Sequence, residues 1–364
     1  MTGRIVLPGA TGYTGGLVLD SLRRRGIEPV LAGRDRDALH ALAQRSRGLD
    51  YALVDVTDAA SIAAVVGRGD VLITTVGPFE RFGHVVARAA ADIGAHYIDS
   101  TGEVGFVRGL HRDLNDRARA TGAVMVPAFG YDYVPGILAG TLAAHRAGDR
   151  ARSIDIGYFA TGPLWRGLSQ GTRTTMRDAV TLPIVSWRDR RITDARTASK
   201  VRAFTVRGRR RSAFLVSGTE VLYLPSAFPA LDNVTVYNGW FPALSRLISV
   251  QTAIAAATVR IPGGRALVDL LSRPMIGPAG GPDTAERART LTHVVAVASD
   301  VTGALAEVHL EGPSIYTLTG ELIAWGAAQL LTGPRLTTGV VGPIEAFGRE
   351  ALLQGCAEIG LIAI

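Results

Sequence analysis

The first residues whose spacing suggests chemistry are the glycines of Gly9-Ala10-Thr11-Gly12-Tyr13-Thr14-Gly15. They follow an apolar run at 4–8, typical of a strand buried on both faces, and they precede a helical pattern. Gly12 lets the backbone approach a pyrophosphate, and Gly15 lets the helix pack closely on the strand. Backbone N–H groups at the helix start then face the phosphates. The turn therefore predicts a dinucleotide site formed by Gly9, Thr11, Gly12, Tyr13, Thr14 and Gly15.

The residues after the second predicted strand indicate which dinucleotide binds. This strand ends in Ala32-Gly33-Arg34-Asp35. An NAD site usually carries Asp or Glu here, whereas Gly33 leaves room for a 2′-phosphate and Arg34 supplies a cation to pair with it. We therefore predict NADP(H), held in part by Gly33 and Arg34. Asp35 has two alternatives: it serves NAD, or it caps the following helix.

Two further strand ends extend the predicted cofactor site. Asp55 and Val56 follow the third strand, where they are placed to contact the adenine; capping of the next helix is the alternative for Asp55. Gly77, Pro78 and Phe79 follow the fourth strand and are expected to run past the pyrophosphate toward the nicotinamide. Both predictions depend on the rule that ligands of open α/β sheets bind at the carboxyl ends of the strands.

A bound nicotinamide supplies hydride, so the protein must supply a proton. Tyr131 and Asp132 follow the sixth strand: Tyr131 is the predicted donor, and Asp132 orients it or the substrate. The alternative is that Asp132 caps the next helix while Tyr131 packs in the core. Glu103 and His96 are weaker candidates.

Other residues direct the substrate prediction and exclude some chemistries. Arg173 is predicted to clamp a substrate carboxylate, with a surface salt bridge as the alternative. Cys356 is the only cysteine and the seven histidines are scattered, so we predict no internal disulfide and no metal site. The only lysine is Lys200, which excludes the Tyr-x-x-x-Lys pair of the usual short-chain dehydrogenase mechanism.

The elements that position these residues form a repeating pattern. Six short apolar runs alternate with helical patterns through the first third of the 364 residues. This rhythm predicts a Rossmann-type α/β fold with a doubly wound parallel sheet. From residue 153 the pattern changes toward the alternation of an antiparallel or mixed sheet, with strands expected at 153–160, 200–206, 213–217 and 234–237. Helices are expected at 243–259, 321–332 and 343–359.

The chain resembles the saccharopine dehydrogenase-like oxidoreductases over most of its length, with the middle third looser. The motifs that carry the resemblance are Gly9–Gly15, Ala32-Gly33-Arg34, Val76-Gly77-Pro78-Phe79, His96-Tyr97-Ile98-Asp99, Thr101-Gly102-Glu103, Gly130-Tyr131-Asp132-Tyr133-Val134-Pro135, Gly171-Thr172, Asn233–Tyr237 and Gly339–Pro343.

The resemblance implies an architecture and a reaction class. It implies an NADP-binding domain at 1–132 completed by a C-terminal helix at 335–364, and an inserted mixed α/β domain at 133–334 that binds substrate and forms a homodimer. It also implies hydride transfer from NADPH to an imine or an enoyl acceptor. One alternative is a trans-acting enoyl reductase acting on carrier-bound lipid or polyketide. Another is a non-catalytic protein that senses NADP(H) and regulates a partner.

The charge of the chain offers a second clue to its partners. All but one of the 39 basic residues are arginines, the formal net charge is +7, and arginines are densest at 188–211. The segment is interpreted as a solvated hairpin that protects an edge strand, or as a docking site for an anionic acyl carrier. Nucleic acid is not expected, because aromatic residues are nearly absent there. With no signal peptide and no spanning segment, we expect a cytoplasmic protein.

Overall fold

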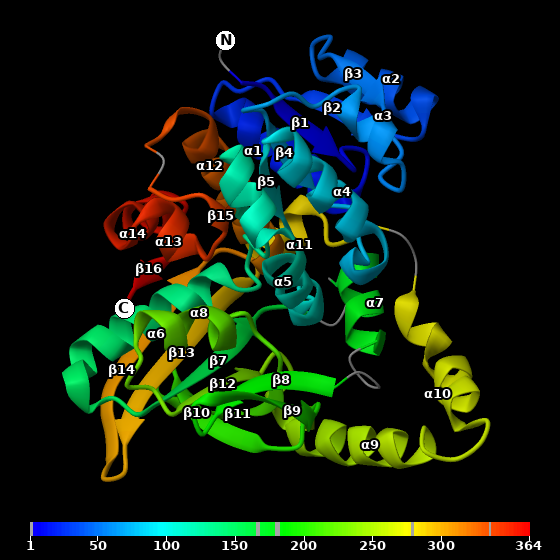
Figure 1. Cartoon of the computed structure of the whole chain (residues 1–364). Coiled ribbons are helices and arrows are strands. Elements are labelled where there is room, and N and C mark those ends of the chain that lie inside the picture. Colours follow the sequence, from blue (N-terminus) through cyan, green and yellow to red (C-terminus); the bar gives the residue numbers. More distant parts are fainter. Residues whose placement is uncertain (1–2, 165–167, 179–182, 278–279, 335) are drawn as a thin grey trace. The chain divides into compact units, whose positions relative to one another are not determined.

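The structure is a computed structural model that describes every residue except 1–2, 165–167, 179–182, 278–279 and 335. The chain divides into two compact units, shown in Figure 1. Unit 1 comprises residues 1–134 and 316–359, and unit 2 comprises residues 135–315 and 360–364. From the sequence we expected domain boundaries after 132 and 334. The helix expected at 321–332, within the inserted domain, extends over Ile315–Thr332 and lies almost wholly in unit 1. Residue 335 lies outside the described residues.

Unit 1 is built on parallel strands that alternate with helices. Its elements are β1 (Ile5–Pro8), α1 (Tyr13–Arg24), β2 (Val30–Gly33), α2 (Arg36–Arg45), β3 (Tyr51–Leu53), α3 (Ala59–Ala63), β4 (Val71–Thr74), α4 (Phe79–Ile93), β5 (His96–Asp99), α5 (Val104–Thr121), β6 (Val124–Val126), α12 (Ile315–Thr332), β15 (Gly339–Val340), α13 (Pro343–Phe347) and α14 (Arg349–Glu358). The sheet order is β15-β6-β5-β4-β1-β2-β3, and every pair is parallel. The predicted Rossmann-type sheet is therefore confirmed.

The sheet of unit 1 is buried because helices cover it. Residues of β1, β4 and β5 are all buried, which explains their continuous apolar runs. Helices α3, α4 and α5 pack against one another in sequence. On α1, Ser21 and Arg25 hydrogen-bond to Glu321 of α12 at 3.0 and 2.5 Å. This partly buried link joins the C-terminal part of the chain to the first helix of the nucleotide fold.

The predicted final helix at 343–359 is wrong in one respect. The structure has two helices, α13 and α14, which are separated at Gly348. Gly348 has a φ of 79°, in the left-handed region that glycine adopts readily, and this conformation interrupts the helical hydrogen bonds.

Unit 2 contains a mixed sheet, as predicted. Its elements are α6 (Val134–Ala147), η1 (Gly148–Arg150), β7 (Ser153–Thr161), α7 (Gln170–Asp178), β8 (Pro183–Arg188), β9 (Arg191–Arg196), β10 (Val201–Val206), β11 (Arg209–Val216), α8 (Glu220–Ala227), β12 (Asn233–Asn238), η3 (Pro242–Leu244), α9 (Ser245–Thr258), α10 (Gly264–Ser272), η4 (Arg273–Ile276), α11 (Thr284–Ala288), β13 (Leu291–Asp300), β14 (Gly303–Gly312) and β16 (Ile362–Ala363). The strand order is β10-β11-β12-β7-β13-β14-β16, and β8 pairs with both β12 and β9. Among the strand pairs that the structure describes in this sheet, only β12 and β7 run parallel.

A cluster of apolar side chains forms the core on one face of this second sheet. Phe159 of β7, Phe204 of β10 and Tyr237 of β12 lie at its centre, with ring centroids 5.6–5.7 Å apart in edge-on pairs. On the other face, α6 packs against α8 and β7, because a Cβ added at Gly140 would lie 2.6 Å from Leu224 of α8 and 3.3 Å from Ile156 of β7. The sheet is therefore packed on both faces along β7. None of the described helices is long and apolar enough to cross a membrane.

Candidate functional site

The glycine turn between β1 and α1 leaves room for a phosphate. Gly9 has a φ of 85° and its carbonyl accepts the N–H of Gly12 at 2.9 Å. A Cβ added at Gly15 would lie 2.0 Å from the Gly9 oxygen, so only glycine allows this contact between helix and turn. Gly12 is the N-cap residue of α1, and no side chain caps this helix. The start of a helix that no side chain caps suits an anion, because its N–H groups carry partial positive charge.

The neighbouring residues of the turn lie where a dinucleotide would contact them. Thr11 and Gly12 are exposed, and Tyr13 and Thr14 are half-buried. The Tyr13 ring packs edge-on against Tyr316 of α12, with centroids 5.3 Å apart. The turn thus offers small or polar groups on its open side while its aromatic side chain is anchored.

Arg34 and Asp35 at the end of β2 have different roles. Arg34 is exposed, while the Asp35 carboxylate caps α2 by accepting the N–H of Ala38 at 3.0 Å. The capping alternative considered for Asp35 is therefore the one found. Because Asp35 caps the helix and Arg34 is exposed, the exposed charge at this strand end is a cation, which fits a 2′-phosphate.

Asp55 forms a local turn and does not cap α3. Its carboxylate accepts the backbone N–H and the hydroxyl of Thr57, at 2.9 and 2.7 Å. These hydrogen bonds, with a smaller contribution from Arg34, lower the pKa of Asp55. The cap of α3 is Asp58, which accepts the N–H of Ala60. The proposed capping role of Asp55 is thus wrong, and Val56 beside it is buried.

The end of β4 contributes backbone to the predicted site, and its aromatic side chain turns inward. Gly77 is exposed and Pro78 is half-buried, whereas Phe79 is buried against Phe106. Helix α4 begins at Phe79, directly after this segment. The reason is Glu103, whose carboxylate accepts the N–H groups of Phe79 and Glu80 at 2.9 and 2.8 Å. A carboxylate at a helix N-terminus is stabilised by the helix dipole.

Both weaker proton-donor candidates have structural contacts. Glu103 is bound to α4 as described. His96 is fully buried in β5, and its Nδ1 accepts the backbone N–H of Val124 at 3.1 Å.

The segment that carries Tyr131 and Asp132 is fixed by three elements. The Asp99 carboxylate at the end of β5 accepts the N–H of Ala128 at 2.8 Å. The N–H of Tyr131 donates to Thr319 Oγ1 of α12 at 3.2 Å, and the hydroxyl of Tyr133 donates to the carbonyl of Gly102 at 2.7 Å. The loop after β6 is thereby held at the carboxyl edge of the sheet, where cofactors of this fold bind.

Asp132 itself carries an unusual carboxyl group. It is only partly exposed, and burial raises its pKa to about 7. Among the described residues no N–H donates to this carboxylate, so the capping alternative has no hydrogen bond to support it. Tyr131 beside it is 3 % exposed. The pair therefore combines a carboxyl group that holds a proton near neutral pH with a buried phenol.

Sequence reasoning named the strand ends and missed the residues that hold them. Asp99 was quoted only as part of a motif, although its position at a strand end was a usable signal. Thr319 had no signal, because its contact with Tyr131 joins segments 188 residues apart. In unit 2, the Arg173 guanidinium donates to the carbonyl of Leu168 at 2.5 Å, within its own helix start. Its proposed contact with a substrate carboxylate stays a prediction.

The comparisons with known proteins agree with this geometry. Residues 5–126 match the family model described as the saccharopine dehydrogenase NADP binding domain. The chain carries an NADP-binding domain of the saccharopine dehydrogenase type. This finding confirms the predicted resemblance to saccharopine dehydrogenase-like oxidoreductases and the predicted cofactor, NADP(H). The glycine turn and Arg34 are part of the matched domain and fit the cofactor.

Similarity extends beyond the NADP-binding domain. A Mycobacterium tuberculosis protein named as a proposed trans-acting enoyl reductase is 28 % identical, with 98 % of this chain and 96 % of that protein covered. A trans-acting enoyl reductase of Mycobacterium ulcerans is 35 % identical over 46 % of this chain and 40 % of its own length. The chain is also similar in structure to saccharopine dehydrogenase (L-Glu forming) from Saccharomyces cerevisiae, with a TM-score of 0.63 and 14 % sequence identity. The match covers 100 % of this chain and 99 % of the yeast chain. The class predicted for the chain, an NADP-dependent oxidoreductase, is confirmed.

Proposed function

We propose that the protein reduces the carbon–carbon double bond of an enoyl thioester that is attached to a carrier. The observation that carries the proposal is Asp132, a partly buried carboxyl group with a pKa of about 7 at the carboxyl edge of the NADP-binding sheet. The relatives named as trans-acting enoyl reductases support an enoyl acceptor over the alternative, an imine.

The proposed chemistry divides between cofactor and protein. NADPH supplies the hydride, which adds to the β-carbon of the enoyl group. The electron pair of the double bond then moves to the α-carbon, which must take a proton from the protein. A group with a pKa near 7 is protonated often enough at neutral pH to donate and acidic enough to release the proton. Asp132 meets this condition, so the proposal exchanges the two roles predicted from the sequence: Asp132 donates the proton, and Tyr131 beside it would relay the proton or orient the substrate.

The cofactor is held by the residues already described. The N–H groups at the start of α1 and the turn of Gly9, Thr11, Gly12, Tyr13, Thr14 and Gly15 would bind the pyrophosphate. Gly33 and Arg34 would hold the 2′-phosphate, and the adenine would lie by Asp55 and Val56. Backbone of Gly77 and Pro78, with Phe79 buried behind it, would border the path toward the nicotinamide.

An assay of NADPH oxidation tests the reaction. Crotonyl thioesters of pantetheine and of an acyl carrier protein are expected to be reduced, whereas a cyclic imine is not. Asp132→Asn should lower kcat by about 10²–10⁴-fold, the usual contribution of a general acid, with NADPH binding retained. Reduction of the imine alone would contradict the enoyl proposal. Tight NADPH binding without turnover of any substrate would favour the sensor alternative.

We further propose that the acyl carrier docks on part of the 188–211 segment. The segment comprises the end of β8, strands β9 and β10 and the start of β11, with hairpin turns between β8 and β9 and between β10 and β11. Its arginines have different contacts. Arg196 hydrogen-bonds to α9, and Arg202 and Arg207 pair with Asp155 and Glu311. Side chains exposed at the two turns are Arg190, Arg191, Arg209 and Arg210. Double replacement of Arg209 and Arg210 by Glu should raise KM for the carrier-bound substrate and leave KM for the pantetheine thioester unchanged.

Finally, we propose that the protein is a homodimer formed through unit 2. Helix α9 exposes Leu247, Val250 and Ile254 along one stripe, and each is more than half exposed. Helix α10 adds the exposed side chains of Leu270 and Leu271. Contiguous apolar surface of this kind marks protein interfaces.

Light scattering tests the dimer. Joint replacement of Val250 and Ile254 by Asp should halve the molar mass, whereas Leu353→Asp on α14 is the control for an added surface charge. An unchanged molar mass in the double variant would place any interface elsewhere.

A further inference from the structure

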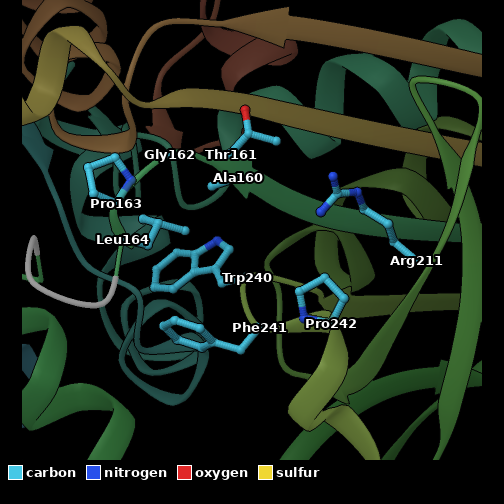
Figure 2. A pocket seen from close by; sticks show the side chains of 9 residues that line it. All are labelled: Ala160, Thr161, Gly162, Pro163, Leu164, Arg211, Trp240, Phe241 and Pro242. Atoms are coloured by element: carbon cyan, nitrogen blue, oxygen red, sulfur yellow. The ribbon is translucent and has the colours of Figure 1, made fainter.

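Unit 2 contains a pocket whose lining residues have no assigned role in the proposed reaction. It has a volume of about 400 Å³ and lies where β7 ends, beside the loop that follows β12 and the start of β11. Figure 2 shows its lining, which consists of Ala160, Thr161, Gly162, Pro163, Leu164, Arg211, Trp240, Phe241 and Pro242. The walls are largely apolar, and Trp240 and Leu164 are buried among them.

The backbone builds this pocket through two glycines. Gly162 has a φ of 111°, and a Cβ there would lie 2.3 Å from the carbonyl oxygen of Arg289. Gly239 passes so close to Phe159 that a Cβ would lie 2.2 Å from the ring. The residues that follow these two glycines, Pro163 and Trp240, line the pocket. The pocket is therefore a product of the packed sheet, and it is not a gap between mobile loops.

Arg211 is the charged group that lines the pocket. Its guanidinium points into the space in front of Trp240 (Figure 2). Its Nε is buried and has no hydrogen-bond partner, and among the described residues no carboxylate pairs with it. A buried donor without an acceptor is costly unless a ligand or water supplies one.

The polar groups around Arg211 lie close to one another. Glu311 is bound through both oxygens by Arg207, at 2.8 and 2.9 Å. His293 Nδ1 lies 3.2 Å from the same carboxylate, and its Nε2 lies 3.1 Å from the Thr161 hydroxyl. Figure 2 shows that this hydroxyl points away from Trp240. Burial lowers the pKa of His293, so its ring is neutral near pH 7 and adds no charge. Arg211 is left as the cation that faces the pocket.

We infer that this pocket binds a ligand with an apolar body and one anionic group, which pairs with the guanidinium of Arg211. A carboxylate and a phosphate monoester both offer two oxygens to the guanidinium fork. The aromatic and aliphatic walls of Trp240, Phe241 and Leu164 suit an acyl chain or the alkyl part of a carrier arm. The inference goes beyond the proposed function, because binding here requires neither NADPH nor turnover.

Calorimetry on the full-length protein tests the inference with two pairs of probes. Octanoate is compared with octanol, and 4′-phosphopantetheine with pantetheine. We expect one anion to bind at least about tenfold more tightly than its neutral partner, the difference that a charge-assisted hydrogen bond supplies. Octanoate as the preferred anion would identify a fatty carboxylate, and 4′-phosphopantetheine would identify a carrier arm.

Variants test whether Arg211 causes the preference for the anion over its neutral partner. Arg211→Gln should abolish the preference for the anion, and Arg211→Lys should keep part of it. Arg152→Gln is the matched control, because Arg152 precedes the opposite end of β7, roughly 25 Å away along the strand. Equal binding of anion and neutral partner, no binding of either pair, or an unchanged preference in Arg211→Gln would overturn the inference. NADPH is left out of these titrations, so their outcome does not depend on whether the protein reduces an enoyl thioester.

Discussion

The carboxylate of Asp99 accepts the backbone N–H of Ala128 at 2.8 Å, and so it connects the end of β5 to the loop after β6. The same carboxylate accepts the N–H of Thr101 at 2.9 Å, and the Asp99 carbonyl accepts the N–H of Phe129. Burial raises the pKa of Asp99 to about 6, so the carboxyl group is ionised at neutral pH despite its fully buried position. A buried anion therefore helps to hold the loop that presents Asp132, together with the contacts of Tyr131 and Tyr133.

Replacing Asp99 should destabilise this loop and the fold together. In Asp99→Ala the N–H groups of Ala128 and Thr101 lose their acceptor inside the protein, at a cost of about 1–3 kcal/mol each. We expect a lower midpoint of urea unfolding and a lower kcat, with KM for NADPH little changed. Asp99→Asn keeps one carbonyl oxygen and should lose less stability. Equal stability of Asp99→Ala and the unchanged protein would contradict the positioning role.

Asp132→Asn should increase stability at neutral pH while it lowers activity. The folded pKa of about 7 exceeds the ordinary value of 3.8, so the unfolded chain releases the proton at lower pH. The free energy of unfolding of the unchanged protein therefore falls as pH rises from about 4 to about 7, by at most about 1.4 kcal/mol per pH unit. The Asn variant lacks this contribution.

Urea unfolding at several pH values checks this prediction. The stability advantage of Asp132→Asn should be absent below pH about 4, grow up to about 7 and then level off. A constant difference across this range would show that the pKa of Asp132 is not raised in the folded protein. Asp194→Asn, which replaces an exposed carboxylate in β9, is the control for removal of a charge.

Arg34→Ala should weaken NADPH binding much more than NADH binding. Loss of a charge-assisted pair with the 2′-phosphate corresponds to about a tenfold or larger rise in KM for NADPH. Asp35→Ala is the matched neighbour, because Asp35 caps α2 and should cost about 1 kcal/mol of stability without changing the cofactor preference. An equal rise in KM for both cofactors would contradict the assignment of Arg34.

The sequence predicted the first unit well because its signals are local. Each parallel strand is a short buried run and each strand end is marked, so Gly33, Asp55 and Gly77 were found at the edge of the sheet. The second sheet was less predictable. Strand β7 pairs with β13 more than 100 residues away, and β13 and β14 were not among the expected strands. Residues that hold the site, such as Thr319 in contact with Tyr131, also depend on contacts between distant segments. No local sequence pattern indicates such a contact.

Two adjacent glycines at the start of α1, Gly15 and Gly16, differ sharply in the space available to a side chain. A Cβ at Gly15 would lie 2.0 Å from the Gly9 carbonyl oxygen, whereas a Cβ at Gly16 meets nothing within 4 Å. Gly15→Ala should therefore displace α1 from the turn, lower thermal stability and abolish NADPH binding.

Gly16→Ala should instead stabilise the protein by up to about 1 kcal/mol, because alanine replaces glycine inside a helix with no clash. Thermal unfolding and NADPH titration of both variants measure the two effects. If Gly15→Ala bound NADPH normally, the close packing of α1 on the turn would not be what shapes the phosphate site. We expect the change in stability to be negative for Gly15→Ala and positive for Gly16→Ala. Helix propensity alone would raise the stability of both variants, so opposite changes would show a local steric requirement at Gly15.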